Sequence, residues 1–281
     1  MANQRTLKTQ VACKGVGLHS GINTTMILAP APEDAGIVFE RVDLEGARVE
    51  ANLDNTVASR LCTVLSKDGA EVRTVEHVLA ALAGTGVDNV LVRLDGPEIP
   101  AMDGSALPFV RLIRRAGLEE QQAKRRLLRV TQPIEVRDGD KSIRAYPYPG
   151  LRFSCVIEYA HPVLRRQAYA ITLQDGQFTS QLARARTFGF LKDAGVLRKN
   201  GFARGASVAN VLLIGRDRVI NGGLRFSNEF VRHKILDIIG DLCLLGMPLL
   251  GHVVANKAGH SLNRQLAAKL RESTDHWQLV E

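Results

Sequence analysis

Three polar residues with the chemistry of metal ligands recur every four positions in the segment RHKILDIIGDL, as His233, Asp237 and Asp241. Residues four apart lie one above the other on an α-helix, so an imidazole and a carboxylate can converge on one ion. Imidazole and carboxylate together form a ligand set that suits zinc. An ordinary His–Asp pair on a helix surface has the same spacing. The apolar residues on both sides of Asp237 favour burial, where a charged group needs a partner.

A further histidine, His77, follows Glu76 at the expected start of a helix in the first half of the chain. Three protein ligands with an open fourth position are typical of catalytic zinc, and a neighbouring carboxylate that does not bind the metal can take the proton from bound water. On this interpretation His77, His233 and Asp237 are the ligands and Glu76 is the general base. The alternative for Glu76 is an acidic residue that the helix dipole stabilises in a first turn.

Two more histidines lie at turns. His260, in KAGH at the start of the last expected helix, has the position of a general acid or electrostatic stabiliser, and Asp241 could orient it. A capping or turn residue is the alternative. His19 lies in the glycine-rich segment GVGLHSG, whose backbone N–H groups could face an anion. A simple hairpin is the alternative there.

The elements that would position these residues form two similar series, each with strands followed by helices. In the first half, we expect strands at 7–13, 24–28, 36–42 and 89–94 and helices at 74–84 and 105–116, with Thr74 as an N-cap. In the second half, we expect strands at 128–136, 142–148, 151–159 and 249–255 and helices at 228–245 and 261–271. This order favours two α+β domains over an alternating parallel-sheet fold. The polar segment 119–126 is the expected linker between them.

The composition limits the class of protein. The chain has 281 residues and only four cysteines, none in a C-x-x-C pair, which argues against a disulfide framework and against a thiolate zinc site. The first ten residues are polar and lack the apolar core of an export signal. The most apolar stretch, 238–255, is interrupted by polar residues, glycine and proline and is too short to span a bilayer. We therefore expect a cytoplasmic protein.

The net charge of +8 leaves several partners open. A nucleic acid, an anionic membrane surface or a phosphorylated substrate would each suit a basic protein. The basic clusters at 114–115, 124–126 and 165–166 lack the interleaved aromatic residues that stack on bases. Nucleic-acid binding is therefore the less favoured interpretation.

Seven segments in the right order resemble the UDP-3-O-acyl-N-acetylglucosamine deacetylase family, zinc enzymes of bacterial lipid A synthesis. These segments are GVGLHSG (15–21), TVEHVLAALAG (74–84), GPEIPAMDGSA (96–106), DGDK (138–141), RARTFGF (184–190), GLRFSNEFVRHKILDIIGDL (223–242) and KAGHSLN (257–263). Together they cover nearly the whole chain. The segment 204–215 departs from the family pattern, because it has Val208-Ala209-Asn210 where relatives often carry an acidic residue.

The resemblance implies a role for each candidate residue. It implies that zinc binds to His77, His233 and Asp237, with Glu76 as the general base and His260, partnered by Asp241, as the catalytic histidine. It implies that Thr187 and Lys234 hold the carbonyl oxygen or the developing oxyanion, which needs fixed donors or positive charge. It implies contacts with the substrate, mostly its nucleotide part, for His19, Lys141, Glu158, Tyr159, Phe188 and Lys257.

The resemblance also sharpens the expected fold and partners. We expect domains at 1–122 and 127–281, each a small sheet with two helices, with the helices sandwiched between the two sheets and an acyl-chain passage in an inserted region at about 190–222. The implied substrate is a UDP-linked, acylated N-acetylglucosamine. We expect a monomer in the cytoplasm of a Gram-negative bacterium, with at most peripheral contact with the inner membrane. Another zinc amidohydrolase is the alternative function.

Overall fold

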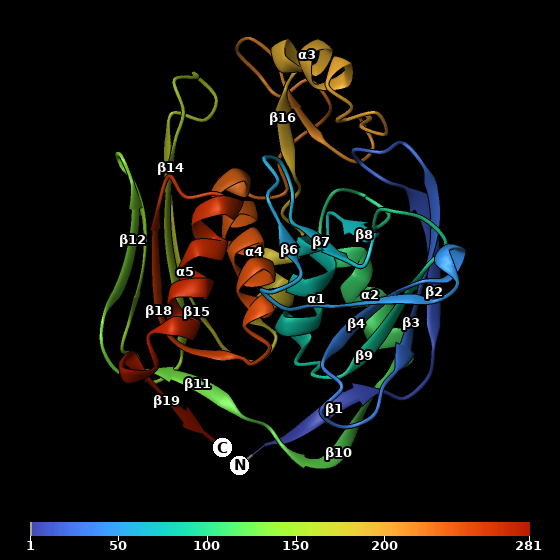
Figure 1. The fold of residues 1–281 in the computed structure, drawn as a ribbon. Helices are drawn as coiled ribbons and strands as arrows, with labels where there is room; N and C mark the ends of the chain where they lie inside the picture. The colour runs from blue at the N-terminus through green and yellow to red at the C-terminus, as the bar shows by residue number, and fades with distance from the viewer. Residues whose placement is uncertain (1) are drawn as a thin grey trace.

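Two β-sheets lie on opposite sides of a central group of helices (Figure 1). The computed structural model describes residues 2–281. One sheet is built from the first third of the chain and the other from residues 127–280. The predicted α+β fold with its helices sandwiched between two sheets is therefore confirmed, whereas the proposed domain boundaries stay a prediction.

The N-terminal sheet has five strands in the order β2-β3-β9-β4-β5. Their bounds are β2 (Val11–Val16), β3 (Asn23–Pro30), β4 (Ile37–Arg41), β5 (Ala47–Glu50) and β9 (Val90–Leu94). In β3 the side chains of Thr24, Met26 and Leu28 are buried and alternate with more exposed ones, which is the pattern of a strand with one face on the core. A separate sheet of β6 (Thr56–Val57), β7 (Val64–Lys67) and β8 (Ala70–Arg73) was not predicted.

The C-terminal sheet has seven strands around β18 (Leu249–Asn256), whose residues alternate between buried and half-buried along its whole length. β18 pairs with three other strands, antiparallel with β13 and parallel with β11 and β14. The remaining bounds are β11 (Leu127–Val130), β12 (Ile134–Asp138), β13 (Lys141–Tyr146), β14 (Leu151–Glu158), β15 (Arg166–Leu173) and β19 (Trp277–Val280).

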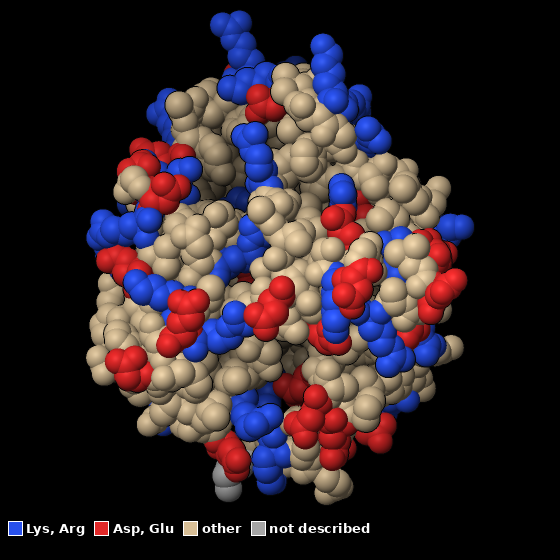
Figure 2. Space-filling model, in the orientation of Figure 1, with Lys and Arg blue, Asp and Glu red and all other residues tan. Residues whose placement is uncertain are grey.

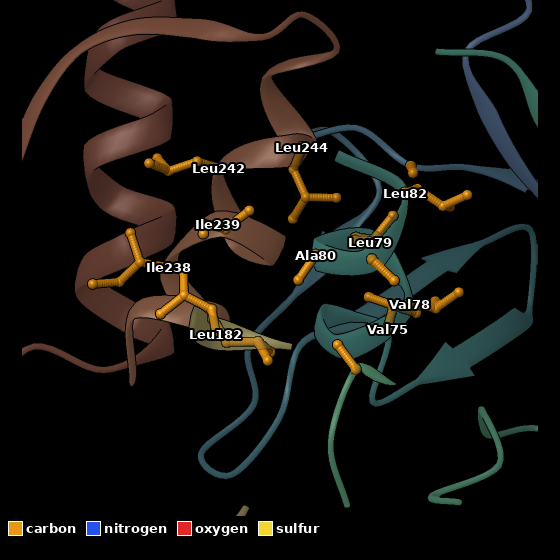
Figure 3. Close-up of a cluster of buried hydrophobic side chains, with 14 of the residues drawn as sticks. Val75, Val78, Leu79, Ala80, Leu82, Leu182, Ile238, Ile239, Leu242 and Leu244 are labelled. Carbon is orange, nitrogen blue, oxygen red and sulfur yellow. The ribbon is translucent and has the colours of Figure 1, made fainter. Parts of the chain in front are cut away.

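Four helices fill the space between the sheets, two from each half (Figure 1). They are α1 (Glu76–Thr85), α2 (Leu107–Ala116), α4 (Glu229–Leu242) and α5 (His260–Glu272). Leu79 and Ala80 of α1 and Ile238 and Ile239 of α4 belong to one buried apolar cluster (Figure 3), and α1 packs against α4. Burial of this apolar surface holds the two halves together.

Gly240 allows the backbones of α1 and α4 to approach closely. A Cβ atom at this position would lie 2.1 Å from the carbonyl oxygen of Glu76. We predict that Gly240→Ala destabilises the protein by about 1–3 kcal/mol, because the two helices would have to move apart. Urea denaturation measures this change. Gly195→Ala is the control, since a Cβ there meets no atom within 4 Å and should not lower stability.

Several predicted elements were wrong in their bounds. Segment 7–13 is not one strand, because β1 (Asn3–Leu7) and β2 belong to different sheets. Segment 128–136 is split between β11 and β12 by Pro133, which lacks the N–H donor of a ladder and restricts the residue before it. Thr74 is not a helix cap. It has a φ of +58°, and its hydroxyl donates to Glu98 instead of to the start of α1.

Most of the expected linker, 119–126, lies in a strand. β10 (Leu118–Lys124) pairs antiparallel with β1 in a two-stranded ribbon. The ribbon is largely exposed, so its polar residues lack the alternation of apolar side chains that would have predicted a strand. The path between the halves is thus hydrogen-bonded to the start of the chain.

An inserted region projects beyond the two sheets, at the top of Figure 1. It contains β16 (Phe188–Phe190), a 3₁₀ turn (Leu191–Asp193), α3 (Ala194–Lys199) and β17 (Leu212–Ile214). β16 and β17 pair in parallel and connect the projection to the body of the protein. Within residues 2–281, no helix is both long enough and apolar enough to cross a membrane.

Candidate metal centre and active site

His77, His233 and Asp237 lie together where α1 crosses α4. His77 is in the first turn of α1, and the other two are one turn apart on α4. Asp237 Oδ1 lies 3.3 Å from His233 Nε2 and 3.7 Å from His77 Nε2, and one possible ligand atom from each residue lies within 4.8 Å of the others. All three side chains are buried. Three donors from two helices therefore converge on one point.

The protonation states of the three side chains suit metal binding. Burial lowers the pKa of His77 to about 3 and also lowers the pKa of His233. Burial opposes ionisation of Asp237, but the nearby His233 and Lys234 outweigh it and hold the pKa of this carboxyl well below its usual range. The imidazoles are thus neutral and the carboxylate is ionised at neutral pH. These are the forms that a metal ion requires.

The hydrogen bonds leave one atom of each ligand free to face the common point. Asp237 Oδ2 accepts a hydrogen bond of 2.8 Å from Lys234 Nζ, whereas the buried Asp237 Oδ1 has no hydrogen-bond partner. His233 Nδ1 donates to the carbonyl oxygen of Ala185 at 3.1 Å, which turns Nε2 towards Asp237. A buried carboxylate oxygen without a partner is costly, and a bound cation would satisfy it. The three residues therefore fit a metal ion.

Glu76 and His260 face each other beside these ligands. Glu76 Oε1 lies 3.9 Å from His260 Nε2, and His260 Nδ1 donates to Asp241 Oδ2 at 2.9 Å. Burial raises the pKa of Glu76 to about 7. Burial would lower the pKa of His260, but the adjacent Asp241 outweighs it and raises this pKa to about 9. An acid and a base with pKa values on either side of the neutral range can both transfer protons.

Thr63 connects Glu76 to the Asp241–His260 pair, and it was not predicted from the sequence. Its backbone N–H donates to Glu76 Oε2 at 3.0 Å, and its hydroxyl donates to Asp241 Oδ1. Asn263 Nδ2 donates to the other oxygen, Asp241 Oδ2, at 2.8 Å. Thr63 is fully buried and lies 178 positions from Asp241 in the chain, so no local pattern connects them. Asp241 is thus held at both oxygens while it orients His260.

We predict that Thr63→Val lowers kcat by roughly 10- to 100-fold, as the loss of an orienting hydrogen bond beside a metal site does elsewhere. Valine keeps the shape and the backbone N–H but removes the hydroxyl. Thr63→Ser restores the hydroxyl and should recover most of the activity. Steady-state kinetics of both variants measure this effect. Equal activities for the valine and serine variants would exclude a positioning role of the hydroxyl.

A cavity of about 740 Å³ opens beside the acid–base pair. It is lined by His260 and Lys234 and by four of the residues expected to contact substrate, which are His19, Lys141, Tyr159 and Lys257. Glu158 does not line it but pairs with Lys257 at 2.7 Å, and Asp140 pairs with the same lysine at 3.0 Å. The cavity also contains Arg60, Arg73 and Arg264, which the sequence did not single out. Its six lysines and arginines outnumber its two acidic residues, Glu71 and Asp138, so the cavity suits an anion.

The glycine-rich turn that contains His19 already binds a carboxylate of the protein, that of Glu98. The backbone N–H groups of His19 and Ser20 donate to the fully buried carboxylate of Glu98, at 2.8 and 2.6 Å. The turn joins the antiparallel strands β2 and β3, so the hairpin alternative is correct for its backbone. Of residues 15–21, only His19 lines the cavity, and its Nδ1 accepts a hydrogen bond of 3.3 Å from the Ala203 N–H. Glu98 also accepts the Thr74 hydroxyl and so ties this turn to the start of α1.

Thr187 and Phe188 lie on the segment that leads into the projection. Thr187 N–H donates to the carbonyl oxygen of Gly104 at 2.8 Å. The Phe188 ring lies 6.3 Å from the His233 ring and 6.0 Å from the Tyr159 ring, which places it between the candidate metal ligands and the cavity wall. Neither Thr187 nor Phe188 lines the large cavity itself.

A buried glutamate at the start of α4 anchors this segment, and it too was not predicted. Glu229 is fully buried and binds Arg186 through the backbone N–H at 3.0 Å and through the guanidinium at 2.8 Å. Arg186 lies between Ala185, whose carbonyl accepts His233 Nδ1, and Thr187. The ion pair therefore positions the segment against His233, one of the candidate metal ligands.

Comparison with known proteins gives the family. Residues 4–272 match the family described as LpxC, UDP-3-O-acyl N-acetylglycosamine deacetylase. A protein of Myxococcus xanthus named UDP-3-O-acyl-N-acetylglucosamine deacetylase is 46% identical over 99% of this chain and 89% of its own length. Proteins of the same name from an Anaeromyxobacter species and from Acidithiobacillus ferrooxidans are 50% and 46% identical, over 95% and 100% of this chain and 88% and 94% of their own lengths. The chain therefore belongs to the UDP-3-O-acyl-N-acetylglucosamine deacetylase family.

Proposed function

We propose that this protein is a zinc-dependent deacetylase that hydrolyses the N-acetyl group of UDP-3-O-acyl-N-acetylglucosamine and releases acetate, the committed step of lipid A synthesis. The observation that carries the proposal is the buried group of His77, His233 and Asp237, with Asp237 Oδ1 unpartnered, directly beside the Glu76–His260 pair. The family match supports the substrate. Neutral imidazole nitrogens and a carboxylate oxygen suit zinc.

The residues of the site divide the reaction between them. Zinc, when bound, supplies a Lewis acid that polarises the amide carbonyl and makes a water molecule more acidic. Glu76 takes the proton from the attacking water. Lys234 and Thr187 hold the negative charge that develops on the carbonyl oxygen. His260, which Asp241 keeps protonated at neutral pH, gives its proton to the amine nitrogen as the C–N bond breaks.

The residues that line the cavity favour a substrate with a nucleotide part. Lys141, Lys257 and three arginines line it, and their positive charge suits a diphosphate. His19 lines it as well, but burial lowers the pKa of this imidazole and favours its neutral form, which can still hydrogen-bond to the substrate. Tyr159 lines this cavity and also a neighbouring depression that contains Glu158, where the proposed uracil contacts would form, and Phe188 packs against Tyr159. The proposal includes an acyl passage in region 190–222. It also includes a monomeric state and a cytoplasmic location, and four free cysteines suit the reducing cytoplasm.

The pH dependence of activity should be bell-shaped. Glu76 acts as a base only when it is deprotonated, so activity falls as the pH drops below about 7, the pKa to which burial raises this carboxyl. His260 acts as an acid only when it is protonated, so activity falls as the pH rises above its pKa of about 9. The two limbs belong to the coupled pair. A profile of kcat/KM between pH 5 and 10 measures them, and His260→Gln should remove the alkaline limb.

An assay of acetate release from UDP-3-O-acyl-N-acetylglucosamine tests the proposed function. The protein as purified should release acetate, a chelator should stop the reaction, and added zinc should restore it. Acetylated sugars and peptides that lack UDP are the matched controls. Turnover of these controls in place of the UDP-linked substrate would identify another amidohydrolase. Undiminished activity in metal-free protein would contradict the mechanism.

A further inference from the structure

The projection formed by residues 191–224, here named the basic tip, has an unusually exposed apolar surface. Among residues 2–281, ten large hydrophobic side chains are exposed, and five of them lie in these 34 residues, namely Leu191, Val196, Val208, Ile220 and Leu224. The α3 helix of the tip has no buried residue, and Val196 on it is 62% exposed. Exposed apolar side chains at this density along one projecting segment favour an interaction surface.

The same residues carry half of the net charge of the chain. The tip contains six basic residues, Lys192, Arg198, Lys199, Arg204, Arg216 and Arg218, and only two acidic ones, Asp193 and Asp217, so its net charge is +4 out of +8. Figure 2 shows basic side chains projecting at the top of the molecule around an uncharged surface. No ion pair within residues 2–281 involves any of the six basic side chains. Their charge is therefore available to an external anion.

We propose that the basic tip docks the protein on an anionic lipid bilayer. Aliphatic side chains interspersed with lysine and arginine suit the interface of such a bilayer, because the former enter the acyl boundary while the latter contact the lipid phosphates. The exposed apolar side chains are aliphatic, so they cannot stack on nucleic-acid bases. A second copy of the chain would bring two surfaces of +4 together, and like charges oppose such contact.

The basic tip is hydrogen-bonded to a residue that lines the active-site cavity, so docking of the tip would also position the cavity. The backbone N–H groups of Arg204 and Gly205 donate to the carbonyl oxygens of His19 and Leu18, and His19 lines the cavity. Docking would therefore hold the cavity beside the bilayer surface. The benefit of this position for catalysis rests on the proposed function, whose substrate carries an acyl chain. The docking itself does not rest on the proposed function.

Co-sedimentation of the full chain with lipid vesicles tests this inference. We expect binding to vesicles of phosphatidylcholine with one quarter phosphatidylglycerol, weaker binding at high salt, and little binding to phosphatidylcholine alone. The variant Arg198→Gln/Lys199→Gln should bind roughly 30-fold more weakly at low salt, at about 5-fold for each cation removed near an anionic surface. Val196→Ser should also weaken binding, since it removes an apolar contact.

Matched variants elsewhere on the surface provide the controls. Arg111→Gln/Arg114→Gln removes the same charge from the exposed side of α2, and Leu279→Ser removes an exposed apolar side chain from β19. Both should bind the anionic vesicles like the unaltered protein. The proposal is overturned if the unaltered protein does not bind these vesicles, if the controls lose as much affinity as the tip variants, or if Val196→Ser has no effect. Acetate release from dissolved substrate, measured without vesicles, tests the proposed function separately.

Discussion

Glu76→Gln should abolish nearly all deacetylase activity while the protein keeps its metal ion. A general base contributes about 10²- to 10⁴-fold to the rate, and glutamine cannot take a proton from water. The carboxyl of Glu76 is buried and its pKa is raised to about 7, so it is a base suited to neutral pH. The measurements are kcat from acetate release and metal content from elemental analysis of the same sample.

Glu76→Gln should remove the base without disturbing the hydrogen bonds or the metal ligands around it. Glutamine has the same shape, and its carbonyl oxygen can still accept the hydrogen bond that Thr63 N–H gives to Glu76 Oε2. Glu76 is not one of the three side chains that converge as possible metal ligands. Unchanged kcat would show that another group removes the proton. Loss of the metal together with activity would instead make Glu76 a ligand.

Asp237→Asn should release the metal ion and reduce activity by at least roughly 100-fold. Substituting a residue that only hydrogen-bonds to a metal ligand costs up to about 100-fold, and loss of a ligand itself should cost no less. Asparagine keeps the volume of the side chain and can still accept a hydrogen bond from Lys234, but it lacks the negative charge that attracts a cation. The measurement is metal affinity, by titration of metal-free protein with zinc, together with kcat at saturating zinc.

Asp241→Asn is the matched control, because Asp241 is one turn further along the same helix. It binds His260 Nδ1 and not the metal ligands, so this variant should keep metal affinity and lose activity. The pair of variants therefore separates a ligand from an orienting residue. Equal metal affinity in Asp237→Asn and the unaltered protein would contradict the proposed centre.

The amino-acid sequence determined those parts of the site that depend on local geometry. His233 and Asp237 are four apart on a strongly apolar segment, so their placement on one face of a buried helix follows from helical periodicity alone. The helices predicted at 105–116 and 261–271 and the strands predicted at 24–28 and 89–94 are present as α2, α5, β3 and β9, with bounds that differ by one or two residues, because local sequence patterns also specify these elements. The ordered set of seven segments predicted the family, and the comparison with known proteins confirmed this prediction.

Only the tertiary structure decided which distant groups meet. The crossing of α1 and α4, made possible by Gly240, brings His77 to Asp237, and the loop of Thr63 brings a hydroxyl to Asp241. The ribbon of β1 and β10 and the burial of Glu98 and Glu229 likewise depend on partners far away in the chain. The pKa values of Glu76 and His260 follow from that burial and those neighbours. Sequence periodicity reports the face on which a side chain lies, whereas its contacts and its charge state depend on what the folded chain packs against it.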